Sequence, residues 1–253
     1  MPSLLAVVAA RILRRPAMLL AGLLLAGCGG GNPHYDPSKP HHTPEGFRNN
    51  FPHAPIGGGL LRWRWQKWRD NLPPPPAHGY PVAGFAQPEL AFLRVNRTQP
   101  TLTWINHATV LIQLGGKNIL TDPIWSERAS PVSFAGPVRR AAPGIRLEDL
   151  PAIDAVVISH NHYDHLDAAS IDRLHARFGK HLHFYVPLNL KAWFTARGIG
   201  NVEELDWWDI RQFDGLSLTF VPAQHWSRRG LFDTNRALWG GWFLQGGGGK
   251  VYS

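Results

Sequence analysis

The sequence predicts an α/β fold in which two β-sheets are sandwiched between layers of helices. Residues 101–105, 109–114 and 117–121 are β-like, and a two-glycine turn before the third makes a tight hairpin. Residues 155–159 form a short β-branched apolar run, which is typical of a fully buried strand. Strand and helix patterns alternate after that run. Hairpins first and strand–helix units later favour an αββα sandwich.

The second half of the chain contains recognisable helix boundaries. Asp167 can cap a helix that carries Ile171, Leu174 and Phe178 on one face and ends at Gly179. We expect strands at residues 183–186, 216–221 and 239–244 and a helix at residues 188–196.

The last residues of the chain resemble the start of another strand. A Gly-rich turn at residues 246–249 leads into residues 250–253, where the sequence stops. Natural domains rarely end inside an uncapped strand. We therefore expect the domain to be incomplete at the C-terminus.

The composition permits a packed core and points to no nucleic-acid module. Hydrophobic residues make up 44% of the 253 residues, and the formal net charge is +8. Such a balance suits an anionic substrate or a lipid surface, but no basic run with interleaved aromatics marks a nucleic-acid site. We expect a phospholipid or another small-molecule substrate and no nucleic-acid partner.

The N-terminus reads as a lipoprotein signal peptide over residues 1–27. Three arginines precede an apolar run at residues 17–25 that is too short to span a bilayer. Residues 25–28, Leu-Ala-Gly-Cys, resemble a bacterial lipobox, in which Cys28 becomes the lipidated N-terminus. The alternative is an ordinary signal peptide with an incidental cysteine. The lipobox predicts a protein anchored by lipid in the bacterial cell envelope, at the outer membrane or the periplasmic face.

Between the leader and the sandwich we expect a tether and an extension. Residues 28–50 are rich in Gly, Pro, His and Asn, which indicates a tether. Residues 51–100 would form an N-terminal extension that packs on the core domain at residues 101–253. Its helix at residues 60–72 carries Trp65 and Trp68 at helical spacing, between basic residues. A helix packed on the domain is the favoured interpretation, and a membrane-surface helix is the alternative.

Potential metal ligands cluster directly after the buried strand. His160, His162, Asp164 and His165 lie within six positions, where a loop between strand and helix allows their side chains to converge. Zinc takes nitrogen and oxygen ligands, and a catalytic zinc site has three protein ligands and one open position. The alternative, a run of surface histidines, is disfavoured by the strand context and by the later His225.

The run from residue 159 to 167 resembles the His-x-His-x-Asp-His signature of the metallo-β-lactamase superfamily. The flanking motifs resemble the branch that contains N-acylphosphatidylethanolamine-hydrolysing phospholipase D and RomA-like bacterial proteins. These flanking motifs lie at residues 104–109, 122–123, 222–226 and 240–242.

The resemblance implies a set of site residues. His160, His162 and His225 would hold one zinc ion, and Asp164 and His165 would begin a second zinc site. Asp164 would also orient the nucleophile, and His107 would contact substrate or metal-bound water. Asp122 would orient a ligand, although an aspartate that only caps a turn fits as well. The remaining ligands of the second site are expected beyond residue 253.

The implied function is that of a zinc-dependent hydrolase of phosphodiester bonds, acting like a phospholipase D on N-acylphosphatidylethanolamine or a related phospholipid. Two alternatives stay open. One is the same metal chemistry on a lactone, an amide or a nucleotide phosphodiester, and the other is a non-catalytic zinc-binding envelope lipoprotein. The full-length protein would bind two zinc ions. The chain as written would bind at most about one zinc ion and be inactive, because two ligands do not suffice for the second.

Overall fold

The computed structural model describes residues 31–52, 59–73 and 87–253. The expected signal peptide and Cys28 lie outside these residues. Within the described ranges, no helix has both the length and the apolar character needed to cross a bilayer.

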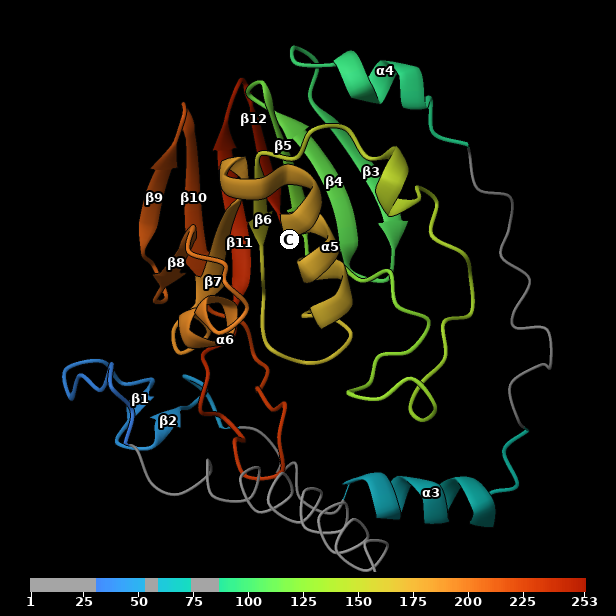
Figure 1. The fold of residues 1–253 in the computed structure, drawn as a ribbon. Helices are drawn as coiled ribbons and strands as arrows, with labels where there is room; N and C mark the ends of the chain where they lie inside the picture. Colours follow the sequence, from blue (N-terminus) through green and yellow to red (C-terminus); the bar gives the residue numbers. More distant parts are fainter. Residues whose placement is uncertain (1–30, 53–58, 74–86) are drawn as a thin grey trace, which may run out of the picture.

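A six-stranded sheet and a four-stranded sheet pack face to face (Figure 1). The first three strands of the larger sheet are antiparallel, and the following strands pair in parallel. In spatial order this sheet contains β3 (Thr101–Asn106), β4 (Thr109–Leu114), β5 (Lys117–Thr121), β6 (Ala155–Val157), β7 (His183–Pro187) and β8 (Val202–Leu205). The smaller sheet is antiparallel and contains β12 (Gly249–Tyr252), β11 (Gly241–Gly246), β10 (Leu216–Val221) and β9 (Ile210–Phe213).

Two apolar cores hold these layers together. The core between the sheets includes the fully buried Ile119, Leu218 and Trp239. The second core lies between the six-stranded sheet and the helices, and it includes Ile171 and Phe194. Apolar residues on both faces of β6 explain why its sequence is continuously apolar rather than alternating.

The helices with buried side chains all contribute to the core on the six-stranded sheet. They are α4 (Leu90–Val95), α5 (Ala168–Phe178) and α6 (Lys191–Thr195), with the short 3-10 turn η1 (Leu147–Asp149). A second 3-10 turn, η2 (Gly179–His181), has no buried side chain. Asp167 precedes α5 but does not cap it, because its carboxylate accepts hydrogen bonds from the hydroxyls of Ser126 and Ser170 instead. Gly179 ends α5 with a φ of +62°. Among the described residues we find no helix layer on the outer face of the four-stranded sheet, where Ile210 and Tyr252 are exposed.

Several predicted boundaries differ from the structure. The helix expected at residues 188–196 is confined to α6, because Leu188 and Leu190 continue from β7 into the core. The short strands β8 and β9 and the short helix α4 were not predicted. Each has six residues or fewer, too few for a hydrophobic period to stand out.

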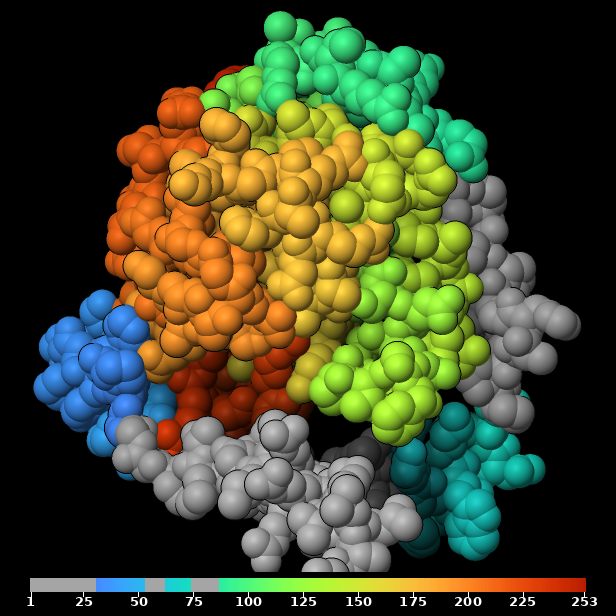
Figure 2. Space-filling view, viewed as in Figure 1, coloured from blue at the N-terminus to red at the C-terminus, as the bar shows by residue number. Residues whose placement is uncertain are grey.

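Residues 31–50 are folded onto the domain, so the prediction of a tether is wrong for this segment. It forms the small hairpin β1 (His42–Thr43) and β2 (Gly46–Phe47), and Phe47 enters the core between the sheets. Figure 2 shows this blue segment lying directly against the orange surface of the later half of the chain. The composition was misleading because buried polar side chains, rather than apolar ones, make most of the contacts.

Asp206 is the partner that allows those polar side chains to be buried. His41 Nε2 lies 2.7 Å from its Oδ1, and His42 Nε2 lies 2.9 Å from its Oδ2. Lys39 Nζ makes a 2.5 Å ion pair with Oδ2. Burial acts to raise the pKa of Asp206, but hydrogen bonds from His41 and Lys39 outweigh it and hold that pKa well below 3.8. The ammonium of Lys39 already occupies the cation position, so this group suits an internal ion-pair cluster better than a metal site.

The helix α3 (Gly59–Arg69) does not pack as predicted. Trp63 and Trp65 are each 54% exposed, and Trp68 is 78% exposed. Figure 1 draws α3 apart from both sheets. Among the described residues of the extension, Leu93 of α4 is buried in the core. The helical spacing of the tryptophans could not predict their exposure, because the apolar face of a helix can pack equally well against protein or against lipid.

Candidate metal centre

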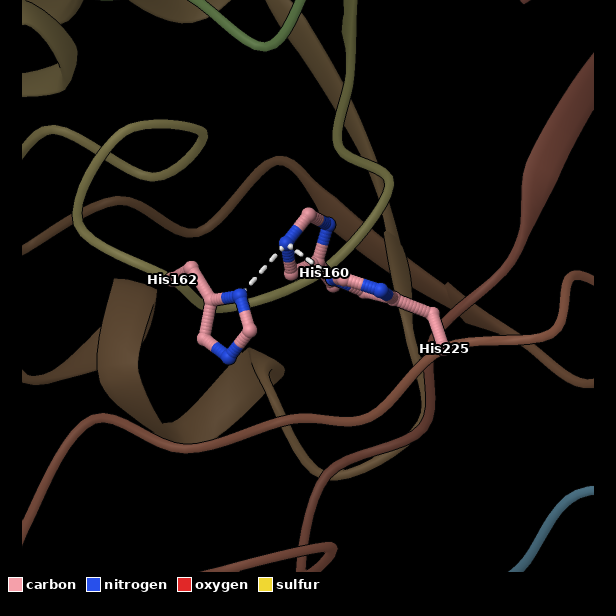
Figure 3. Close-up of side chains that lie close together, drawn as sticks. All are labelled: His160, His162 and His225. Atoms are coloured by element: carbon pink, nitrogen blue, oxygen red, sulfur yellow. Dashed lines mark hydrogen bonds between the residues drawn. The ribbon is translucent and has the colours of Figure 1, made fainter. Parts of the chain in front are cut away.

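Three histidines from two distant loops converge at one end of the sandwich (Figure 3). His160 and His162 lie on the loop between β6 and α5, and His225 follows β10. Nε2 of His160 is 2.9 Å from Nδ1 of His162 and 3.1 Å from Nε2 of His225. The structure therefore brings together the three residues that the resemblance assigned to one zinc ion.

The surroundings favour neutral imidazoles in this group. Burial, followed by the neighbouring histidines, lowers the pKa of His160, and burial lowers that of His162 to about 4. Burial also lowers the pKa of His225. A neutral imidazole offers the lone pair that a metal requires. These three side chains are thus in the ligand form at neutral pH.

The donor set fits a metal ion. Three imidazole nitrogens, one from each histidine, lie within 4.8 Å of one another, and His162 faces His160 through its Nδ1. A cluster of buried nitrogen lone pairs is unfavourable unless a cation or protons satisfy it. Three imidazole ligands correspond to a catalytic zinc site.

A second group lies beside the first and contains His107, Asp164 and His165. Oδ2 of Asp164 is 3.0 Å from Nε2 of His107 and 3.6 Å from Nε2 of His165. Burial acts to raise the pKa of Asp164, but His165 and His107 outweigh it, so that pKa is lowered and the carboxylate is ionised at neutral pH. His107 lies between β3 and β4 with a φ of +42°, and its contact is with Asp164 rather than with the three-histidine group.

Asp122 contacts the start of the loop after β6 and one of the ligand candidates on that loop. Its carboxylate accepts hydrogen bonds from the main-chain N–H and the hydroxyl of Ser159, at 2.7 and 2.6 Å. Its Oδ2 also lies 2.9 Å from Nδ1 of His165. Burial acts to lower the pKa of His165, but the hydrogen bond and the charge of Asp122 outweigh it and raise that pKa. This arrangement turns Nε2 of His165 toward Asp164.

Arg229 is a site residue that the sequence analysis missed. Its Nη1 donates hydrogen bonds to the carbonyls of Asn161 and Leu166, at 3.1 and 2.6 Å, and its guanidinium lies over the ring of Tyr163. The hydroxyl of Tyr163 in turn donates to the Arg229 carbonyl. These contacts fix the loop that carries His162, Asp164 and His165. The one signal in the sequence for this role is that Arg229 lies four residues after the ligand candidate His225.

A cavity of about 1020 Å³ opens beside both groups. His107, His162 and Asp164 line one part of it. Much of the remaining wall is apolar, and three arginines and two glutamates also contribute: Arg139, Arg140, Arg228, Glu89 and Glu127. An apolar wall with a few cations and the ligand groups at one side suits an amphiphilic, anionic molecule.

Comparison with known proteins decides the family. Residues 117–252 match the model of the β-lactamase superfamily domain. The chain belongs to the β-lactamase superfamily. The match covers both sheets from β5 onward and contains every member of the two groups except His107. The predicted fold class and resemblance are thus confirmed.

Relatives of this superfamily protein include phospholipases. It is 45% identical over 159 residues to N-acyl-phosphatidylethanolamine-hydrolyzing phospholipase D 1 of Caenorhabditis elegans, covering 59% of this chain and 44% of the relative. It is 33% identical over 153 residues to the mitochondrial enzyme of that type from Saccharomyces cerevisiae, covering 59% and 32%. A metal-dependent hydrolase of Methanopyrus kandleri is 30% identical over 156 residues, covering 60% and 59%. The chain thus spans less than two thirds of the length of these relatives, and it belongs to a family of metal-dependent hydrolases.

Proposed function

We propose that this superfamily protein is a zinc-dependent hydrolase of phosphodiester bonds, acting like a phospholipase D on N-acylphosphatidylethanolamine or a related phospholipid. The observation that carries the proposal is the position of the two ligand groups beside a largely apolar cavity with arginines in its wall. The names of the Caenorhabditis and Saccharomyces relatives agree with this substrate class.

The residues of the two groups and of the cavity wall would have different roles in the reaction. His160, His162 and His225 would hold zinc through neutral imidazoles. Bound zinc lowers the pKa of water toward neutrality and polarises a phosphoryl oxygen. Asp164, held ionised between His107 and His165, accepts a hydrogen bond from an attacking water and orients it. The arginines of the cavity wall attract the phosphodiester to the site.

The two groups differ in how well they can hold metal. The three-histidine group is at least half buried and supplies three nitrogen ligands, whereas the His107 side chain of the second group is 52% exposed. Three well-placed ligands are the minimum for a catalytic site. We therefore propose about one tightly bound zinc ion for this chain, in the three-histidine group. A full-length protein would complete a second site around Asp164 and His165, and the chain as written would be inactive or nearly so.

We further propose that the mature protein begins at Cys28 and is held by lipid at a membrane of the bacterial cell envelope. The proposal is supported by the lipobox-like residues 25–28 and by the phospholipid substrate class.

The test is incubation of the full-length protein with N-acylphosphatidylethanolamine and zinc. Formation of phosphatidic acid that is abolished by His225→Ala is the expected result, because that variant removes a zinc ligand. If the protein hydrolyses lactones or β-lactams but no phospholipid, the proposed substrate class is wrong. If it binds zinc and hydrolyses none of these compounds, its zinc is structural.

A further inference from the structure

The side chain of Asn49 pairs with the main chain of His225. Nδ2 of Asn49 donates a hydrogen bond to the His225 carbonyl at 2.7 Å, and the His225 N–H donates to Oδ1 of Asn49 at 3.1 Å. The carboxamide therefore satisfies both main-chain polar groups of one residue, much as a neighbouring β-strand would. The two residues are 176 positions apart in the sequence.

The surrounding contacts hold this pairing in place. Nε1 of the fully buried Trp239 also donates to Oδ1 of Asn49, at 3.1 Å. The next residue toward the strand, Gln224, donates from Nε2 to the Phe51 carbonyl at 3.0 Å. On the other side of Asn49, Phe47 is buried in the core. The carboxamide is thus held by the buried Trp239 as well as by His225, in a segment anchored by Phe47.

The main chain at His225 needs such support because it lies in a loop beyond the end of the sheet. The strand β10 ends at residue 221, so no ladder of strand hydrogen bonds continues to residue 225. Yet Nε2 of His225 has to remain 3.1 Å from Nε2 of His160 for the three-histidine group to persist. A shift of the loop by about 1 Å would move this nitrogen out of position.

We propose that Asn49 is a positioning residue for the metal centre: its carboxamide fixes the main chain of His225 and so places the imidazole with His160 and His162. The residue lies in the segment before the family-matched region of 117–252, so the metal centre depends on a part of the chain outside that region. This inference rests on the proposed metal role of the three histidines.

The experiment compares Asn49→Asp with Asn50→Asp and the unchanged chain. The aspartate at position 49 keeps the shape and the acceptor but loses the N–H donor and places an oxygen against the His225 carbonyl. Asn50 is its exposed neighbour, so Asn50→Asp adds the same charge without touching His225. Zinc affinity is measured by competition with a chelator, and the visible absorption of bound Co²⁺ reports the ligand geometry. Thermal unfolding is recorded in a chelator, so that loss of the fold is seen separately.

We expect Asn49→Asp to weaken zinc binding by about 10–100-fold and to alter the Co²⁺ spectrum, as loss of an orienting partner does. Asn50→Asp should leave both unchanged. If Asn49→Asp does not fold, Asn49→Ala, which removes the pairing without an added charge, takes its place. Equal zinc affinity and an unchanged Co²⁺ spectrum in a folded position-49 variant would overturn the inference. If the unchanged chain binds no zinc, the proposed function fails instead.

Discussion

His225 and His165 are both histidines of the site, but the fold gives them different partners. Nε2 of His225 faces His160, and the main chain of His225 is paired with Asn49. Nδ1 of His165 lies against Asp122, so that its Nε2 faces Asp164. A substitution at one position should therefore have a different consequence from the same substitution at the other.

His225→Ala should abolish the zinc content of this chain, whereas His165→Ala should change it little. The first removes one of three imidazole ligands, and the second leaves the three-histidine group complete. Metal analysis of the purified proteins measures this, with about one zinc ion expected in the unchanged chain. His181→Ala, at an exposed histidine outside both groups, is the control. Two zinc ions in the unchanged chain, or no loss in His225→Ala, would show that the ligands are wrongly assigned.

At the scale of elements, residues 31–52 and α3 depart from their predicted roles in opposite directions. The polar segment packs on the domain, because Asp206 pairs with His41, His42 and Lys39. The helix α3, rich in Trp, is exposed in its described side chains. Composition predicted neither outcome, since burial depends on whether a complementary surface exists elsewhere in the chain.

Asp206→Asn should lower the free energy of unfolding at pH 7 by about 3 kcal/mol, because it removes the buried carboxylate that pairs with Lys39 and contacts His41 and His42. The pKa of Asp206 is lower in the folded protein than the ordinary 3.8. Its stabilising contribution is therefore complete above about pH 5 and is lost as the pH falls through 3.8 toward the folded-state pKa. Urea unfolding across this range should show a steeper acid loss in the unchanged chain than in Asp206→Asn. If stability falls equally fast with pH in both proteins, Asp206 is not the group responsible. The control is Asp214→Asn, which removes the exposed ion pair with Lys117.

Trp65→Ser and Trp68→Ser should each change the free energy of unfolding by less than about 0.5 kcal/mol, because both side chains are more than half exposed. Trp239→Ala should cost about 3–5 kcal/mol, because this side chain is fully buried between the sheets. Denaturant unfolding of the three variants provides the comparison. A large loss of stability in the α3 variants would mean that α3 packs on the domain after all.

At the scale of the whole molecule, the site is assembled at one end of the sandwich by loops from both sheets and by the N-terminal segment. The loop after β6 carries His160 and His162, and the loop after β10 carries His225 and Arg229. Because Arg229 donates to carbonyls of the first loop, movement of one loop disturbs the other. The packed sheets beneath provide the rigid frame that a metal centre requires.

Cys28→Ser should release the protein from the membrane fraction of the bacterial cell without changing its zinc content. Each buried CH₂ of a lipid chain contributes about 0.8 kcal/mol to membrane binding, and the serine cannot carry the thioether-linked lipid. Cell fractionation and mass spectrometry of the mature N-terminus measure the two parts of this prediction. An unmodified Cys28, or unchanged membrane partition of Cys28→Ser, would refute the lipid anchor.

Local patterns determined most of what could be predicted. The buried strand β6, the hairpin from β3 to β5 and the boundaries of α5 follow from periodicity and turn chemistry, which are properties of neighbouring residues. The motif after β6 identified His160, His162, Asp164 and His165 because these ligands lie together in the sequence. Their division into two groups followed from the family resemblance. In the structure, Asp164 and His165 lie with His107, apart from the three-histidine group.

Only the tertiary structure decided which distant polar groups meet. Asn49 pairs with His225 across 176 positions, His41 pairs with Asp206 across 165, and Arg229 reaches Asn161 across 68. No periodicity encodes such pairings, because a hydrogen bond requires a distance and an orientation that the folded backbone alone supplies. For the same reason the segment that looked like a tether is part of the fold: its polar residues are stable in the interior only where the rest of the chain presents partners for them.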